Sequence, residues 1–189
     1  MILTLGSVSA EPPVRPERVE MSTDLNGDGH PEAIRVTFEY NGIDHYTVEI
    51  GNLRVGAFGE ALRGEVFVVD IDSTDGLREI AIPEWGPSDD DASHFFRFHD
   101  GRLTTIGTVP GRHPEEQRID GSGRIRTNCR GHSLQTWFYP CEYMFDIESQ
   151  ALMEVPQKFK LMYSTVTLKR DLPVFETPAM QSATRIIRA

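Results

Sequence analysis

Oxygen-bearing side chains occupy alternate positions in the segment 24–32, which reads DLNGDGHPE. The pattern D-x-[DN]-x-D-G directs side-chain oxygens toward one point of a tight loop, because its glycine permits a sharp turn. Carboxylates held this close repel one another unless a hard cation lies among them, and Ca²⁺ takes about six to eight oxygen ligands. The segment therefore predicts a calcium site with the ligands Asp24, Asn26, Asp28, the main-chain carbonyl of His30, and Glu32.

A related segment begins 46 residues later and reads DIDSTDGLRE. Asp70 and Asp72 match the first two ligand positions, whereas Thr74 stands where the third aspartate is expected. Asp75 and its following glycine come one residue late. This segment either binds a second ion or is a turn without metal. Its candidate ligands are Asp70, Asp72, Thr74, Asp75 and Glu79.

The first loop differs from an EF-hand in the segment that comes after it. An EF-hand requires a bidentate glutamate at loop position 12 and then a helix. Counted from Asp24, that position is Arg35, inside a segment that alternates like a β-strand. Runs of Asn, Asp and Gly also form turns that bind no ion, so that interpretation is the alternative for both loops.

The composition argues against two classes of protein. The chain has 189 residues, a net charge of −10 and a pI near 5.0, which disfavours nucleic-acid binding because that needs Lys and Arg to neutralise phosphates. No apolar run approaches the roughly 18 residues that cross a bilayer, so no transmembrane segment is expected. With 39% hydrophobic and 25% charged residues, a globular fold with a buried core is expected.

Alternating apolar residues predict β-strands along most of the chain. In the segment 32–40 the residues that share one face are Ile34, Val36, Phe38 and Tyr40. The dipeptide at 41–42, Asn-Gly, predicts a two-residue type I′ turn into a second strand at 45–50, and Asp-Gly at 100–101 predicts another hairpin. Short helices are expected only at 57–63 and 153–162. The chain is predicted to be all-β.

The 46-residue spacing of the two acidic loops indicates a structural repeat. Each loop leads through a glutamate into a strand, with Glu32-Ala33-Ile34 in the first and Glu79-Ile80 in the second. A weaker copy, IDGSGRIRTN, begins at Ile119. Self-similarity of this length, filled with short strands, is typical of propeller blades or a related β-repeat array.

An acidic loop followed at once by a strand resembles the FG-GAP/VCBS repeats of integrin-like β-propellers, in which a calcium loop links neighbouring strands of a blade. The resemblance covers 24–36 and 70–82, about two repeats. It implies a small or incomplete β-propeller-like array of antiparallel sheets over 11–165, since this chain has room for about four blades. An incomplete ring leaves sheet edges to be covered, so a homodimer is one expected state.

The two ends of the chain have their own patterns. Residues 1–10, MILTLGSVSA, are either the remnant of a signal peptide or a first strand. Residues 166–189 are predicted to form a β tail that resembles the start of an SH3-like module. Cys129 and Cys141 flank a segment that could fold back as a hairpin, so they either form a disulfide or pack as separate small side chains.

A hydrolase that acts on polysaccharide or cell-wall material is the alternative function. The loop 84–96 gathers Asp89, Asp90, Asp91 and His94 near Trp85, and neighbouring carboxylates can act as acid and base. Adjacent residues of one loop rarely face each other across a substrate, and the chain has no nucleophile motif, so no catalytic residue is assigned.

The segment 134–143 is rich in aromatic residues, which either stack on a ligand or belong to the core. The candidate ligand-binding residues are Trp85, Asp89, Asp90, Trp137 and Tyr139. The sequence as a whole predicts a secreted or cell-surface, calcium-binding β-repeat module with a structural role or with a protein or carbohydrate as its partner.

Overall fold

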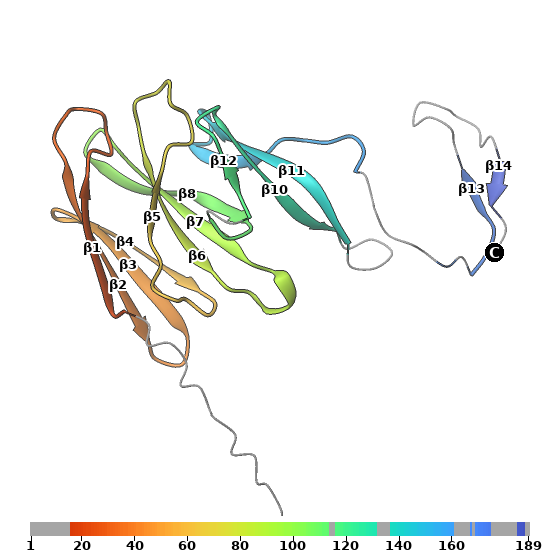
Figure 1. Ribbon diagram of the computed structural model, residues 1–189, viewed down its shortest axis with the longest axis horizontal. Helices are drawn as coiled ribbons and strands as arrows, with labels where there is room; N and C mark the ends of the chain where they lie inside the picture. Colours follow the sequence, from red (N-terminus) through yellow and green to blue (C-terminus); the bar gives the residue numbers. More distant parts are fainter. Residues whose placement is uncertain are drawn as a thin grey trace, which may run out of the picture.

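The computed structural model describes residues 16–113, 116–131, 137–160, 167, 169–174 and 185–187 (Figure 1). Within these ranges the chain is all-β, as predicted, and its one helical element is a 3₁₀ turn at Pro87–Asp89. The prediction for residues 1–10 falls outside the described part of the chain. The short helices expected at 57–63 and 153–162 are wrong, because the described residues there continue strands or form bends.

Twelve of the strands form three four-stranded antiparallel sheets, which lie side by side in chain order (Figure 1). The first sheet contains β1 (Arg18–Thr23), β2 (Glu32–Tyr40), β3 (Asp44–Ile50) and β4 (Leu53–Gly59). The second contains β5 (Phe67–Val69), β6 (Glu79–Glu84), β7 (Ala92–His99) and β8 (Arg102–Pro110). The third contains β9 (Arg118–Ile119), β10 (Arg124–Gly131), β11 (Trp137–Asp146) and β12 (Ala151–Glu154).

Each sheet is a meander in which strands that follow one another in sequence are paired. The acidic loop at 24–31 joins the first two strands of the first sheet, and the loop at 70–78 joins the same two strands of the second. The weak copy at 119 becomes the β9–β10 connection of the third sheet. The repeat seen in the sequence is therefore a repeat of whole four-stranded sheets.

A fourth sheet, of two strands, lies within the predicted C-terminal tail. There β13 (Leu172–Val174) and β14 (Arg185–Ile187) pair with each other in antiparallel fashion. These two short strands are the extent of the β structure described after β12.

One of the two predicted hairpin turns differs from its expected form. The Asp100-Gly101 turn has two residues, both at positive φ (50° and 68°), as a primed turn requires. In the other hairpin Tyr40 pairs with Asp44, so residues 41–43 form a three-residue loop instead of a two-residue one. Only its glycine, Gly42, has a positive φ.

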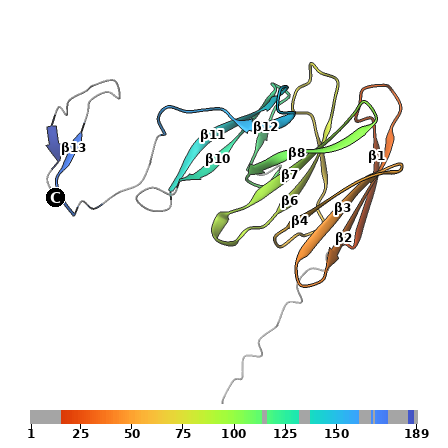
Figure 2. The same cartoon turned by 180° about the vertical axis from the view of Figure 1, so that it is seen from behind.

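Most of the core lies in two apolar layers, one on each face of the second sheet (Figure 2 shows the sheets from behind). Every residue of β6 from Glu79 to Pro83 is buried, because this strand is covered on both faces. The layer against the first sheet includes Leu25, Ile34, Val36, Phe38, Tyr46, Ile80 and Phe96. The layer against the third sheet includes Val69, Ile71, Ala81, Phe95, Ile106, Ile125 and Leu152.

The outer face of the first sheet is charged. Arg35 lies 3.1 Å from Glu20 and 3.7 Å from Glu49, and Arg18 and Arg54 pair with the same two glutamates. A blade inside a closed propeller buries both faces, whereas a terminal repeat has a polar outer face. The apolar stack therefore stops at this sheet, and the described residues do not close into a ring of sheets.

Successive sheets are joined by equivalent backbone contacts between their loops. The amide of Arg78 donates to the carbonyl of Leu25 at 2.9 Å, and the amide of Gly123 donates to the carbonyl of Ile71 at 2.7 Å. Leu25 and Ile71 each follow the first aspartate of their loop. The same position of the repeat thus accepts the hydrogen bond at both junctions.

Two glycines of the first loop allow the contact at the first junction to be tested. A Cβ at Gly27 would lie 2.5 Å from the carbonyl oxygen of Gly76, whereas a Cβ at Gly29 would meet nothing within 4 Å. Both have positive φ (74° and 85°), so alanine at either position costs about 1 kcal/mol of backbone strain. We expect Gly27→Ala to lower the free energy of unfolding by about 1 to 3 kcal/mol more than Gly29→Ala in urea titrations. Equal losses would show that the loops are not in close contact.

Candidate functional site

The loop between β1 and β2 is folded around Asp24. The two carboxylate oxygens of Asp24 accept hydrogen bonds from the amides of Gly27 and Gly29, each at 2.8 Å. Desolvation works to raise the pKa of Asp24, but the hydrogen bonds from loop amides outweigh it and hold the pKa below its ordinary value. Asp24 therefore remains ionised at neutral pH, with its oxygens fixed inside the loop.

Asn26 and Asp28 continue the same pattern. Asn26 Oδ1 accepts the amide of Asp28 at 2.9 Å, and Asp28 Oδ1 accepts the amide of His30 at 2.8 Å. The Asn26 Nδ2 group donates to Asp28 Oδ2 at 3.1 Å. Each oxygen in such a bond retains a second lone pair for another donor or a cation. The loop thus brings together the alternate residues that the sequence predicts as ligands.

Glu32 closes the loop from its far end. Its Oε2 accepts a hydrogen bond of 2.7 Å from the amide of Leu25, the residue that follows Asp24. Among the described residues, no Lys, Arg or His forms an ion pair with Asp24, Asp28 or Glu32. Among the described residues, the three carboxylates of the first loop therefore have no ion-paired basic side chain to balance their charge.

The first loop has the donor chemistry of a calcium site but not its coordination geometry. In the described ranges no three His, Cys, Asp or Glu side chains are grouped closely enough to hold a metal ion. The predicted ligands also include the Asn26 amide and the His30 carbonyl, and the carboxylates here face amides of the loop itself. Hard oxygen donors with net negative charge fit Ca²⁺, and binding would require these side chains to turn toward one point.

In the second loop, Glu79 accepts a hydrogen bond equivalent to the one that Glu32 accepts in the first loop. Glu79 Oε2 accepts the amide of Ile71 at 3.2 Å, as Glu32 accepts that of Leu25 in the first loop. Unlike Glu32, Glu79 is completely buried, and its Oε1 lies 2.6 Å from Nη2 and 2.9 Å from Nε of Arg97. Burial raises the pKa of Glu79, and the Arg97 guanidinium and the Ile71 amide act against that rise.

The aspartates of the second loop point in different directions. Asp72 Oδ1 accepts the amide and the hydroxyl of Thr74, at 3.0 and 2.6 Å, and these bonds lower the pKa of Asp72. Asp75 Oδ1 accepts the amide of Leu77 at 2.8 Å. Asp70 Oδ1 is buried without a hydrogen-bond partner among the described groups. Thr74 therefore serves Asp72 as a donor, and the predicted second set of ligands is not brought to one point.

The loop 84–96 disperses its acidic residues among basic partners. Asp90 pairs with Arg130, and Asp91 Oδ2 lies 3.0 Å from Nε of Arg112. Desolvation raises the pKa of Asp91, while Arg112 opposes the rise. The predicted cluster thus forms separate ion pairs and not a pair of free carboxylates.

A cleft with a volume of about 740 Å³ lies between the second and third sheets. The acidic turn 89–91 lines one side of it, and Phe138 and Tyr143 of β11 contribute aromatic surface. Asp89 and Asp90, two of the predicted ligand-binding residues, therefore border a real cleft.

Trp85 is enclosed by two arginines. The guanidinium carbons of Arg63 and Arg112 lie 3.2 and 3.8 Å from the centre of the indole ring. Its Nε1 donates to Glu65 at 3.4 Å. The ring contacts cations of its own chain, so a sugar could stack on it only after one of these arginines moved away.

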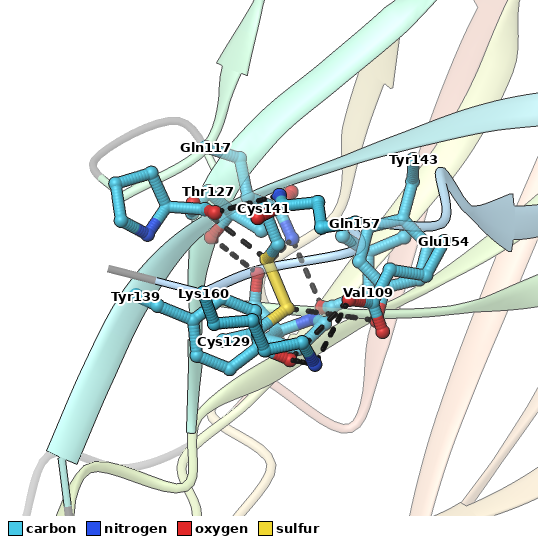
Figure 3. The surroundings of a disulfide bond; sticks show 12 residues. Val109, Gln117, Thr127, Cys129, Tyr139, Cys141, Tyr143, Glu154, Gln157 and Lys160 are labelled. Atoms are coloured by element: carbon cyan, nitrogen blue, oxygen red, sulfur yellow. Dashed lines mark hydrogen bonds and ion pairs between the residues drawn. A yellow bond between two sulfur atoms is a disulfide. The ribbon is translucent and has the colours of Figure 1, made fainter. Parts of the chain in front are cut away.

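Cys129 and Cys141 form a disulfide across β10 and β11, with their Cα atoms 5.8 Å apart (Figure 3). Of the two alternatives from the sequence, the bonded one is therefore present. Tyr139 is only 4% exposed and packs against this disulfide together with Trp137, whose ring centre lies 5.3 Å from that of Tyr139. Of the two alternatives for the aromatic segment, ligand stacking or core, Tyr139 therefore belongs to the core.

No family model, curated protein or solved structure matches this chain. Across the described part of the chain, no helix has the length and apolar character needed to span a membrane. The function is therefore inferred from the geometry of the chain itself.

Arg97 contacts the second loop from a neighbouring strand, and the sequence did not identify it as part of the site. It lies on β7, directly opposite Glu79 of β6, and is 8% exposed. The signal for it was an arginine between two phenylalanines in a strand, HFFRFH, because a buried basic residue requires an acidic partner. Sequence spacing alone did not show that this partner was the loop glutamate.

Trp137 and Phe138 provide a matched test of the aromatic segment. They are neighbours on β11, but Trp137 packs against the disulfide cluster whereas Phe138 is 39% exposed. We expect Trp137→Ala to reduce the free energy of unfolding by about 2 to 4 kcal/mol and Phe138→Ala by about 0.5 kcal/mol. Thermal or urea unfolding of both variants measures this difference. A Trp137→Ala protein as stable as the wild type would instead place the indole on a ligand-binding surface.

Proposed function

We propose that the protein is a secreted or cell-surface module that binds one calcium ion in the loop 24–32 and uses it to stabilise an FG-GAP/VCBS-like array of β-sheets. The observation that carries the proposal is the first loop, which holds three carboxylates with no ion-paired basic partner among the described residues. This loop joins β1 to β2 of the first sheet and contacts the second loop. Its role is structural or partner-binding.

Three further features support this proposal. The acidic loops recur at the same place in the first two sheets, between the first and second strands, as in calcium-binding propeller blades. The disulfide Cys129–Cys141 is typical of oxidising compartments, where millimolar calcium is also common. The charged outer face of the first sheet suits a small stack of blades better than a closed ring.

The hydrolase alternative has less support. Although the acidic turn 89–91 borders the cleft between the second and third sheets, Asp90 and Asp91 are each paired with an arginine. A glycosidase needs two carboxyl groups facing each other across the scissile bond, one of which is free to donate a proton. The cleft is better suited to a bound partner than to acid–base chemistry.

Calcium should raise the stability of the protein. A ligand that binds only the folded state adds RT ln(1 + [Ca²⁺]/Kd), so a Kd of about 0.1 to 1 mM gives about 0.4 to 1.4 kcal/mol in 1 mM calcium. For a chain of this size that corresponds to a rise of a few degrees in Tm. Differential scanning calorimetry in calcium and in EDTA measures the effect. Magnesium should do much less, because it demands a tight octahedral shell.

Asp28→Ala should abolish most of this response, since it removes a ligand from the middle of the loop. Glu148→Ala is the matched control, because Glu148 is an exposed acid in the β11–β12 turn and its loss changes the net charge equally. A Tm that is the same in millimolar calcium and in EDTA would rule out the calcium site. A response that Asp28→Ala and Glu148→Ala weaken equally would indicate general charge screening.

A further inference from the structure

We propose that Arg97 supplies the positive charge of the second acidic loop, in the place that a calcium ion would occupy, so that this loop binds no metal. The number of ions bound by the whole chain, one and not two, depends on the proposed function of the first loop. The assignment of Arg97 depends only on the contacts of the second loop.

The contacts of Arg97 are those of a counterion to the loop. Its guanidinium lies 2.6 Å from Oε1 of Glu79, the residue that corresponds to the ligand Glu32, and 3.3 Å from Oδ2 of Asp75. Arg97, Asp72 and Asp75 line the same cleft, which has a volume of about 600 Å³. The guanidinium thus contacts two of the four acidic residues that the sequence predicts as ligands of this loop, and it lines the same cleft as a third.

The guanidinium is also fixed in place. Arg97 is 8% exposed, lies directly opposite Glu79 in the β6–β7 register, and has its guanidinium carbon 4.0 Å from the ring centre of Phe145 on β11. A planar guanidinium that makes two bonds to one carboxylate oxygen and stacks on an aromatic ring has little freedom to move aside. A divalent cation among the same carboxylates would lie close to this fixed positive charge and be repelled by it.

Among the described residues, the first loop has no such counterion. The β2–β3 pairing ends at Ile34 and Ile50, so Glu32 has no residue of β3 opposite it, whereas Glu79 has Arg97 opposite it on β7. Arg78, from the neighbouring loop, donates to the hydroxyl of Thr23 at 3.4 Å and forms no ion pair with the described acidic residues of the first loop. The two loops therefore balance similar negative charge in different ways.

The first aspartate of the second loop also lies apart from the others. Asp70 lines a cavity with Ser73, His113 and Asp120, away from the cleft that contains Asp72 and Asp75. In the first loop the corresponding Asp24 is directed into its own loop by two glycine amides. Asp72, Asp75 and Glu79 are therefore the donors whose charge Arg97 balances, while Asp70 is directed elsewhere.

The test is calcium binding to the full, disulfide-bonded chain, measured by isothermal titration calorimetry and by Tm. We expect the wild type to bind one ion and Asp28→Ala to bind none at calcium concentrations up to about 10 mM, well above the Kd range of such modules. In the Asp28→Ala background, Arg97→Gln should gain calcium binding and a Tm that rises with calcium. Arg97→Lys in the same background should not, because it keeps the positive charge.

Asp72→Asn in the otherwise wild-type chain gives a readout that does not require changing the buried arginine. We expect the number of ions bound and the Kd to stay within about twofold of the wild type, because the second loop holds no ion. A wild type that binds two ions, or an Asp72→Asn protein that loses one, would overturn the proposal. So would a folded Arg97→Gln variant that gains no calcium binding.

The outcomes also separate this proposal from the proposed function. If the wild type binds no calcium but Arg97→Gln gains a site that Asp72→Asn then removes, the function proposed for the first loop fails while the role of Arg97 stands. If the wild type binds one ion that Asp28→Ala retains and Asp72→Asn abolishes, the second loop is the calcium site and the role of Arg97 is wrong.

Discussion

The second sheet is covered on both faces, and the rest of the fold depends on this. A sheet with one apolar face needs one partner, but β6 is buried from Glu79 to Pro83 and has apolar layers on both sides. The first and third sheets must therefore stay in fixed positions on either side of it. Because strands of different sheets share no ladder of hydrogen bonds, the loops at the sheet ends provide the directional contacts between them.

Those loops are the acidic segments, which explains why charged and glycine-rich sequence recurs beside strands of nearly continuous apolar residues. Leu25 and Ile71 accept the same inter-loop hydrogen bond at the two junctions, and Glu32 and Glu79 hold the amides of these same two residues. Each glutamate thus fixes the residue that contacts the next sheet. The charge of the loops and the position of the sheets are linked through one main-chain unit in each repeat.

The sequence was sufficient for the features that depend on neighbouring residues. Alternation predicted the strands, Asp100-Gly101 predicted its turn, and the 46-residue spacing predicted a repeat that the structure shows to be a four-stranded sheet. The features that it missed depend on distant residues. The helices expected at 57–63 and 153–162 reflect weak local preference overridden by strand pairing, and the ion pair between Glu79 and Arg97 joins residues that meet only through the β6–β7 register.

The negative charge of the acidic loops is balanced differently at the two junctions between sheets. At the second junction Glu79 and Arg97 are both buried, and the loss of hydration is offset by short hydrogen bonds and by the ring of Phe145. Because the positive charge belongs to a side chain of the protein, this pairing does not depend on the concentration of calcium. At the first junction the carboxylates remain near solvent and are held by amides of their own loop, which leaves their charge to be balanced from outside. On the proposed assignment, calcium therefore adjusts the contact between the first two sheets, while the contact between the second and third stays constant.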